Sequence, residues 1–248
     1  MIKFNFLGRG MELSELVTFN GRLLTFDDRT GIVFEINGDN VAPWVIITDG
    51  ETISSKGFKS EWATVKNSQL FVGSMGKEWT NGGGEFENYN PMMVKVINVN
   101  GEVKTLNWVK NFKSVRSSLN IEWPGYMIHE SGAWSEHHKK WYFLPRRCSS
   151  QKYNETLDES RGCNFLITAD ETFTIIEKIK VGEVKPTRGY SSFKFLPSSN
   201  DSIIVALKTE ELNGSTSTFV TVFDIKGNVL MEDEKIHTEY KYEGFEFI

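Results

Sequence analysis

A small set of serine and glutamate residues recurs along the chain in similar surroundings, and their oxygen atoms could bind a hard metal cation. They are spaced by gaps of 47, 69, 61 and 52 residues, and they are Ser14, Glu61, Glu130, Ser191 and Glu243. Each lies among small residues and close to apolar or aromatic ones, where a bare carboxylate is costly or shifts its pKa. Oxygen donors of this kind are typical of Ca²⁺ sites. The pattern therefore predicts Ca²⁺ binding, and the alternative is a set of ordinary carboxylates at strand ends.

A second group combines basic and aromatic side chains, as a site for an anion with an attached ring would. Its members are Arg9, Lys59, Lys77, Trp79, Arg146 and Arg147. Guanidinium groups bind phosphate in a bidentate way, and an indole ring can stack on a nucleobase. A solvated charged rim is an equally compatible interpretation. The histidines show no zinc spacing, and the sequence has no Ser or Cys nucleophile motif.

The elements that must position these residues are predicted to be mostly β-strands. Residues 16–19 and 23–26 flank Asn20-Gly21, which predicts a hairpin with a primed turn. Three further groups of strand-like runs follow, at 62–65, 70–72 and 93–99, at 141–144, 164–168 and 174–179, and at 193–196, 203–207 and 218–223. Residues 108–119 instead have helical spacing. A loose repeat of strands predicts an all-β propeller, in which equivalent positions of successive blades converge on one axis.

Composition is consistent with one domain spanning residues 1–248, because no linker divides the chain. The net charge of -5 argues against nucleic acid as a partner. No apolar run approaches 18 residues, so no membrane span is expected. Residues 2–7 alternate like a strand, and no signal peptide is expected at Met1. Cys148 and Cys163 flank a polar stretch between two strand-like runs; they could pair or remain free thiols.

Several phrases resemble the calcium-activated nucleotidase family, the apyrases. They are GRGMELSEL (8–16), DDRTG (27–31), PWVI (43–46), GFKSEW (57–62), GKEWT (76–80), PGYMIHES (124–131), FLPRR (143–147), SSFKF (191–195), IIVALK (203–208) and KYEGFEFI (241–248). They cover essentially the whole chain. The resemblance implies a five-bladed β-propeller with Ca²⁺ near its axis, and a secreted or secretory-lumen location.

The resemblance also implies an activity and roles for individual residues. The expected reaction is Ca²⁺-dependent hydrolysis of nucleoside di- and triphosphates (ADP, UDP, GDP and ATP) with release of phosphate. Ca²⁺ ligands are implied at the five recurring positions, with Ser14 acting through its carbonyl. Asp28, Lys77 and Arg146 are expected to be catalytic, with the two cations stabilising the transferring phosphoryl group. Trp79 and Arg147, both in the basic and aromatic group, are expected to bind the substrate.

Two departures from the family pattern qualify these expectations. Met92 follows Pro91 where the vertebrate branch has an acidic residue, which favours ADP and ATP as substrates. Family members also carry additional sequence before the phrase that begins at Gly8, including an acidic motif and outer strands. Four blades plus the inner strand of an incomplete fifth blade are therefore expected. The unpaired edge would favour a homodimer or aggregation, and the alternative function is a truncated, inactive propeller that binds Ca²⁺ or nucleotide.

Overall fold

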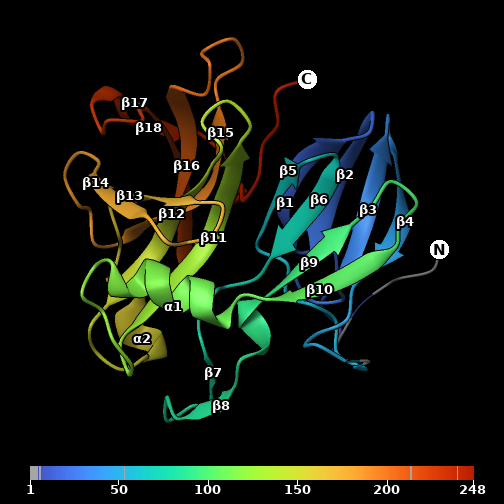
Figure 1. Cartoon of the computed structure of the whole chain (residues 1–248), viewed down its shortest axis with the longest axis horizontal. Helices are drawn as coiled ribbons and strands as arrows, with labels where there is room; N and C mark the ends of the chain where they lie inside the picture. Colours follow the sequence, from blue (N-terminus) through green and yellow to red (C-terminus); the bar gives the residue numbers. More distant parts are fainter. Residues whose placement is uncertain (1–4, 6, 53, 213, 239) are drawn as a thin grey trace.

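A computed structural model describes residues 5, 7–52, 54–212, 214–238 and 240–248. It contains four four-stranded antiparallel sheets, hereafter blades one to four in chain order (Figure 1). Blade one comprises β1 (Leu13–Phe19), β2 (Arg22–Asp27), β3 (Ile32–Asn37) and β4 (Asn40–Ile46). Blade two comprises β5 (Trp62–Lys66), β6 (Gln69–Gly73), β9 (Met93–Ile97) and β10 (Val103–Asn107).

The other two blades repeat this meander. Blade three comprises β11 (Tyr126–Ser135), β12 (Lys140–Ser149), β13 (Phe165–Asp170) and β14 (Ile176–Lys180). Blade four comprises β15 (Arg188–Phe195), β16 (Ile203–Leu212), β17 (Ser215–Asp224) and β18 (Val229–Ile236). The first strand of each blade contacts the first strand of the next, so β1, β5, β11 and β15 line the axis. This is the four-blade part of the predicted propeller.

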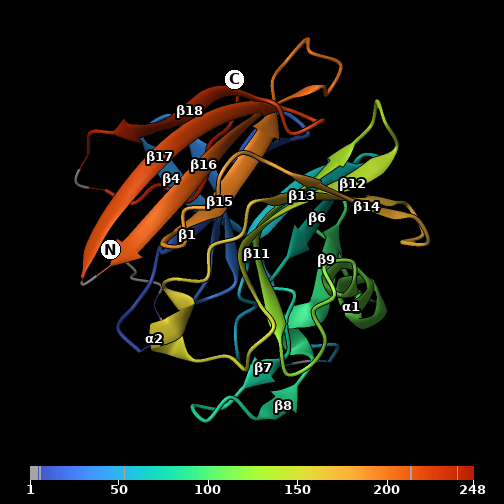
Figure 2. The same ribbon diagram turned by 90° about the vertical axis from the view of Figure 1, so that its left-hand side faces the viewer.

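Shorter elements lie between the strands. They are β7 (Trp79–Thr80), β8 (Phe86–Asn88), the 3₁₀ helix η1 (Asn90–Met92), α1 (Val109–Ser117) and α2 (Glu155–Asp158). The α1 helix confirms the helix predicted for residues 108–119. Both views place α2 and the β7–β8 pair at the same end of the molecule (Figures 1 and 2). None of the helices in the described part of the chain is long and apolar enough to cross a bilayer.

The first predicted hairpin is confirmed. Asn20 and Gly21 both have positive φ, of 49° and 75°, and they connect Phe19 to its partner Arg22. Positive φ at both central residues is what a type I′ turn requires, and its twist matches that of the flanking strands.

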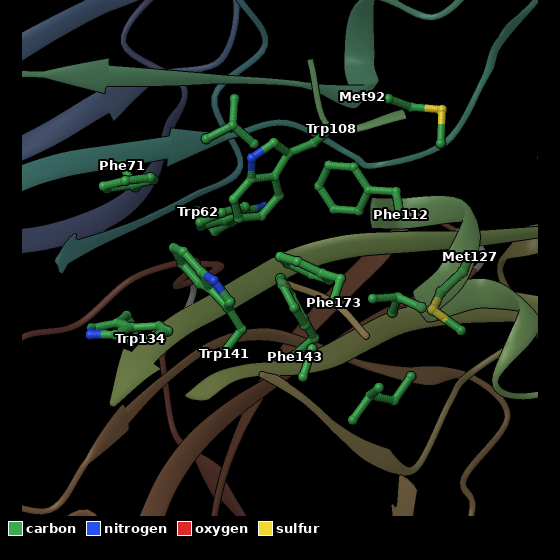
Figure 3. Close-up of a cluster of buried hydrophobic side chains, with 14 of the residues drawn as sticks. Trp62, Phe71, Met92, Trp108, Phe112, Met127, Trp134, Trp141, Phe143 and Phe173 are labelled. Carbon is green, nitrogen blue, oxygen red and sulfur yellow. The ribbon is translucent and has the colours of Figure 1, made fainter. Parts of the chain in front are cut away.

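The core consists of apolar clusters between neighbouring blades. The largest joins blades two and three, and Figure 3 shows Trp62, Trp108, Trp141 and Phe143 packed together there. Two further clusters join blades one and two, and blades three and four. Among the described residues, no such cluster joins blade four to blade one. Contacts there are polar instead, as described below.

The expectation of a fifth blade with an inner strand is not met. Four blades are present, and residues 242–248 form no strand. These residues lie alongside blade one and blade four, and within the described part of the chain no strand pairs with them. Backbone groups there are satisfied in other ways, for example by the Thr218 hydroxyl, which accepts from the Tyr242 N–H at 3.1 Å. A strand needs a neighbour for its ladder, so this segment runs as irregular chain.

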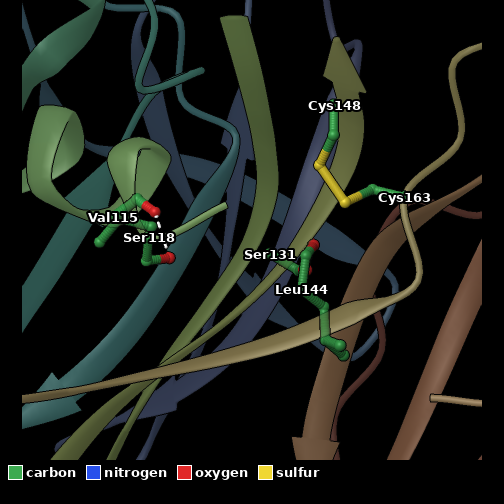
Figure 4. Close-up of a disulfide and its surroundings, with 6 residues drawn as sticks. All are labelled: Val115, Ser118, Ser131, Leu144, Cys148 and Cys163. Carbon is green, nitrogen blue, oxygen red and sulfur yellow. Dashed lines mark hydrogen bonds between the residues drawn. A yellow bond between two sulfur atoms is a disulfide. The ribbon is translucent and has the colours of Figure 1, made fainter. Parts of the chain in front are cut away.

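The two cysteines form a disulfide (Figure 4). Cys148 lies near the end of β12, and Cys163 precedes β13, 15 residues later. The bond closes the segment 149–162, which carries α2, against blade three. The paired alternative left open by the sequence is therefore the correct one.

Candidate functional site

Three of the four strands that line the axis are irregular at the recurring serine and glutamate residues. The register with the second strand shifts between Leu13 and Leu16 in β1, between His129 and Gly132 in β11, and between Tyr190 and Ser192 in β15. A β-bulge bends a strand locally and re-aims its side chains. The repeated phrases of the sequence are therefore local features that turn selected side chains toward the axis.

Each glutamate of the recurring set forms an ion pair with a nearby cation. Glu61 lies 2.6 Å from Lys59 Nζ, Glu130 pairs with Arg146, and Glu243 pairs with Lys241. Lys241 also pairs with Glu211, and Arg146 Nη2 lies 3.4 Å from the same carboxylate. Glu130 and Glu243 thus belong to one network of ion pairs that joins blades three and four to the C-terminal segment, whereas Glu61 pairs with Lys59 outside it.

The charge of Glu130 acts on both Glu61 and Glu243. Burial raises the pKa of Glu61 to about 8, Lys59 opposes this shift, and the negative charge of Glu130 adds to it. Burial likewise raises the pKa of Glu243, and the charge of Glu130 raises it further. Carboxylates that repel one another in a partly dry environment favour the approach of a cation.

The two serines flank this group through contacts with the segments that carry the glutamates. Ser14 is buried, and its hydroxyl donates to the carbonyl of Ser60, next to Glu61. Ser191 is also buried, and its hydroxyl lies 3.5 Å from the carbonyl of Tyr242, next to Glu243. All five residues that the sequence singled out are therefore brought to one region.

The position of Glu243 depends on close packing of its segment against β1. A Cβ atom on Gly244 would lie 2.7 Å from the backbone of Glu15, so only glycine allows this approach. Two residues further on, Glu246 accepts a hydrogen bond from the Thr18 N–H at 2.9 Å. The segment that follows Glu243 is thus held against blade one at two positions.

Asp28 joins this region through Lys59. The ammonium of Lys59 lies 2.6 Å from both Asp28 Oδ2 and Glu61 Oε1. Burial acts to lower the pKa of Lys59, but the two carboxylates outweigh it and raise the pKa above its ordinary value. The other oxygen, Asp28 Oδ1, is buried and accepts no hydrogen bond from the described residues, although Arg29 Nε lies 3.5 Å away. This oxygen is therefore a free acceptor beside the carboxylate group.

Arg147 is a buried cation with incomplete pairing. Its side chain is 2% exposed, and Nε lies 3.9 Å from Asp158 Oδ2, which is too far for a hydrogen bond. Nε and Nη1 have no hydrogen-bond partner in the described part of the chain. Burial lowers the pKa of Arg147, and the neighbouring charge of Arg146 lowers it further. Unpaired buried donors of this kind fit an anion better than they fit an apolar core.

Lys77 is a second buried cation that is influenced by the charge of Asp158. It is only 5% exposed, donates to the Glu78 carbonyl at 3.0 Å, and lies 4.4 Å from the Tyr153 ring centroid. Burial lowers the pKa of Lys77 to about 8, while Asp158 acts in the opposite direction. Trp79, half-buried in β7, packs with Tyr153 on the small cluster of Met75, Tyr126 and Ile128. The cation and two aromatic rings are thus next to each other.

Two residues of this neighbourhood escaped sequence analysis. Tyr153 and Asp158 both lie in the disulfide-closed segment 149–162, and the Tyr126 hydroxyl donates to Asp158. This segment shows no strand or helix periodicity, so only its two flanking cysteines could have drawn attention to it. By contrast Arg9, which the sequence included in the basic group, is 57% exposed and pairs with Glu12.

Met92, which the sequence linked to nucleotide preference, lies in the core. Its side chain is fully buried in the cluster between blades two and three, so it offers no surface to a nucleotide (Figure 3). Any influence of this position on substrate choice would have to act through its neighbours.

The residues present fit a hard cation in their chemistry. In the described part of the chain, no group of three or more His, Cys, Asp or Glu side chains is arranged as a ready metal cage. The oxygen donors of this region are of mixed type: the carboxylates of the recurring glutamates, the two serine hydroxyls and the nearby backbone carbonyls of Ser60 and Tyr242. Ca²⁺ accepts such mixed oxygen sets, including backbone carbonyls.

Comparison with known proteins gives a consistent picture. A family model described as Apyrase matches residues 1–248. An apyrase from Cimex lectularius is 53% identical over 99% of this chain and 68% of its own length. Soluble calcium-activated nucleotidase 1 from Rattus norvegicus is 49% identical over 97% of this chain and 60% of its own length. The Caenorhabditis elegans protein Apyrase apy-1 is 46% identical, over 97% and 68% respectively. The chain thus spans about two thirds of the relatives it matches.

Proposed function

Because the chain belongs to the apyrase family, a family of nucleotide-hydrolysing enzymes, we propose that it hydrolyses the terminal phosphate of nucleoside di- and triphosphates in a Ca²⁺-dependent reaction. The observation that carries this proposal is that the recurring glutamates and a buried, incompletely paired arginine lie in the same region. The charge of Glu130 repels Glu61 and Glu243, and it also acts on the buried Arg147, which has two unpaired donor atoms among the described residues.

Glu61, Glu130, Glu243, Ser14 and Ser191 would hold the cation. When bound, Ca²⁺ would neutralise negative charge on the phosphates and order water near them. The repulsion that Glu61 and Glu243 experience from Glu130 supports this assignment, since a divalent cation would relieve it. The name of the rat relative, a calcium-activated nucleotidase, supports the choice of metal.

The substrate phosphates would contact the cations beside the axis. Arg147 offers two unpaired donors, and Arg146 lies next to it in the chain. Lys77 is buried with a lowered pKa, and it carries its charge below about pH 8. Charge that develops on the terminal phosphoryl group and on the leaving phosphate would be stabilised by these fixed cations in an environment with little water. Trp79 would stack on the base.

Asp28 would act on the attacking water. Its Oδ1 is a buried acceptor without a hydrogen bond from the described residues, and Lys59 fixes the opposite oxygen. A carboxylate held in this way can accept a hydrogen bond from water and orient its lone pair toward phosphorus. The products would be the nucleotide shortened by one phosphate, and inorganic phosphate.

The decisive experiment measures phosphate release from ADP, UDP and GDP with Ca²⁺ and with a chelator. Release that requires Ca²⁺ and falls strongly in Asp28→Asn would support the proposal. A matched control is Asp224→Asn, because Asp224 lies at the outer β17–β18 turn and hydrogen bonds only locally. Nucleotide or Ca²⁺ binding without phosphate release would refute hydrolysis by this chain and identify a binding propeller instead.

A further inference from the structure

We propose that Lys56 is a positioning residue that fixes the Trp79 ring for a nucleobase, an inference that rests on the function proposed above. Lys56 Nζ lies 4.4 Å from the centroid of the Trp79 ring, within the range of a cation–π contact. Trp79 also packs on the apolar cluster around Met75 and Tyr126. One face of the indole is therefore occupied by a fixed cation, and a base would use the remaining half-buried ring surface.

Lys56 is held in place by the loop that it ends. The Asp49 N–H donates to the Lys56 carbonyl at 2.9 Å, which closes the loop at its base. Asp49 Oδ2 then lies 3.2 Å from Lys56 Nζ. The loop is fastened to blade two, because the buried Lys95 donates to the Gly50 carbonyl at 2.6 Å. The backbone under Lys56 is thus anchored on both sides.

The same contacts lead back to Trp79. Asn90 Nδ2 donates to Asp49 Oδ2 at 3.1 Å, and the Asn90 N–H donates to Asn88 Oδ1 at 2.9 Å. Asn88 is the partner of Trp79 in the β7–β8 pair. A Cβ atom on Gly50 would lie 3.1 Å from Asn90 Oδ1, so a side chain there would crowd the amide. Backbone and ring of Trp79 are therefore tied to a single closed circuit of polar contacts.

These contacts explain how Lys56, although half-exposed, can orient the Trp79 ring. The Lys56 side chain is 46% exposed, and a free lysine would spread over many rotamers. Asp49 is buried and paired, so it restricts the ammonium to the region over the ring. A ring that is already oriented loses less entropy when a base stacks on it. Lys56 should therefore affect binding of the base and leave the phosphates unaffected.

The test compares Lys56→Ala with the conservative variant Lys56→Arg. The matched control is Lys110→Ala, because Lys110 is an exposed lysine on α1. The affinities of ADP, UDP and inorganic pyrophosphate, which has no base, are measured by calorimetry, and KM and kcat are measured for the nucleotides. Lys56→Ala should weaken the affinity for ADP and UDP and raise their KM by roughly two- to five-fold, the scale of an exposed cation–π contact. kcat and the affinity for pyrophosphate should not change, Lys56→Arg should restore the wild-type values, and Lys110→Ala should have no effect.

Measuring Lys56→Ala in a Trp79→Ala protein tests whether Lys56 acts through the Trp79 ring. In Trp79→Ala, adding Lys56→Ala should cause no further loss of affinity, because the two residues act through one contact. An equal loss for pyrophosphate, additive losses in the double variant, tighter nucleotide binding by Lys56→Ala, or no nucleotide binding by the wild-type chain would each overturn the inference. Nucleotide binding without turnover would refute only the proposed hydrolysis, since the affinities still decide the role of Lys56.

Discussion

Glu15 in blade one accepts a hydrogen bond from the Ser192 hydroxyl in blade four at 3.0 Å, across 177 residues of sequence. Lys194 Nζ lies 3.4 Å from the same carboxylate oxygen. Glu15 is completely buried, and its own neighbour in β1, the Leu16 N–H, also donates to it. Blades one and four, which share no apolar cluster among the described residues, are therefore connected through a buried charged group.

We predict that Glu15 makes stability depend on pH. Burial raises its pKa to about 7, with Lys194 opposing, against 4.5 for the unfolded chain. The native state therefore binds more protons between pH 4.5 and 7, so the contribution of protonated Glu15 is complete below 4.5 and is lost as the pH rises through 7. In Glu15→Gln, urea unfolding across this range should show a smaller decrease in the free energy of unfolding. Curves parallel to the wild type would contradict this, and Glu234→Gln on β18 is the control.

Glu61→Gln should weaken Ca²⁺ binding by roughly ten-fold or more, because a neutral ligand replaces a charged one. Calorimetric titration with Ca²⁺ measures this directly. Glu35→Gln, at a partly exposed position on β3 of blade one that pairs with Arg22, should leave the affinity unchanged. An unchanged affinity in Glu61→Gln would remove this residue from the metal site.

Arg147→Met should stabilise the fold and weaken substrate binding together. The native side chain is buried with two unpaired donors, and an apolar side chain of similar length removes that cost, which we put at about 1 kcal/mol or more. Loss of a buried anion contact should raise KM about ten-fold or more. Thermal unfolding and kinetics of one protein preparation check both. Destabilisation together with an unchanged KM would mean that Arg147 is structural, and Arg22→Met is the surface control.

Lys77 should give activity an alkaline limit. Its pKa of about 8 lies below the ordinary 10.5, so the charge that binds phosphate is lost above pH 8 and KM should rise there. Stability should move in the other direction: the unfolded chain binds more protons between pH 8 and 10.5, so the contribution of Lys77 to the free energy of unfolding increases over that range. Lys77→Gln should abolish both trends, whereas Lys110→Gln should retain them.

Replacing both cysteines, as Cys148→Ser with Cys163→Ser, should destabilise the protein by about 3 kcal/mol, the value expected for a closed loop of this length. Because the segment carries Tyr153 and Asp158, KM should rise as well. Thermal unfolding and initial rates below the unfolding transition separate the two effects. If KM stays at the wild-type value, the segment takes no part in substrate binding.

The sequence predicts the features that depend on apolar periodicity and turn chemistry. The Asn20-Gly21 hairpin, the α1 helix and most second and third strands of the blades belong to this class. The outer strand β4 was missed because it is exposed along most of its length and lacks an alternating apolar pattern. The irregular course of residues 242–248 also could not be foreseen, since their composition alone favours a strand.

The candidate site divides in the same way. The recurring residues Ser14, Glu61 and Glu130 could be found because each lies in a repeated phrase. Their cation partners could not be assigned, because a contact such as that of Lys59 with Asp28 depends on how blades one and two pack. Tyr153 and Asp158 were missed because a polar loop carries no periodic signal that places it over a site.

The contact between blades one and four differs in kind from the other three contacts between neighbouring blades. Apolar clusters fill three of the joints between blades, whereas within the described residues the fourth depends on Glu15, on Glu246 and on the close packing of Gly244. Transient native-state openings should begin at this joint, because segments with few buried apolar contacts open most readily. Glu243 lies in the C-terminal segment 242–248, which contacts both blades. A ligand that binds Glu243 and Glu61 together would therefore hold this joint closed. Ligand binding at the axis and closure of the joint between blades one and four would then be thermodynamically coupled. Each would stabilise the other by the same free energy.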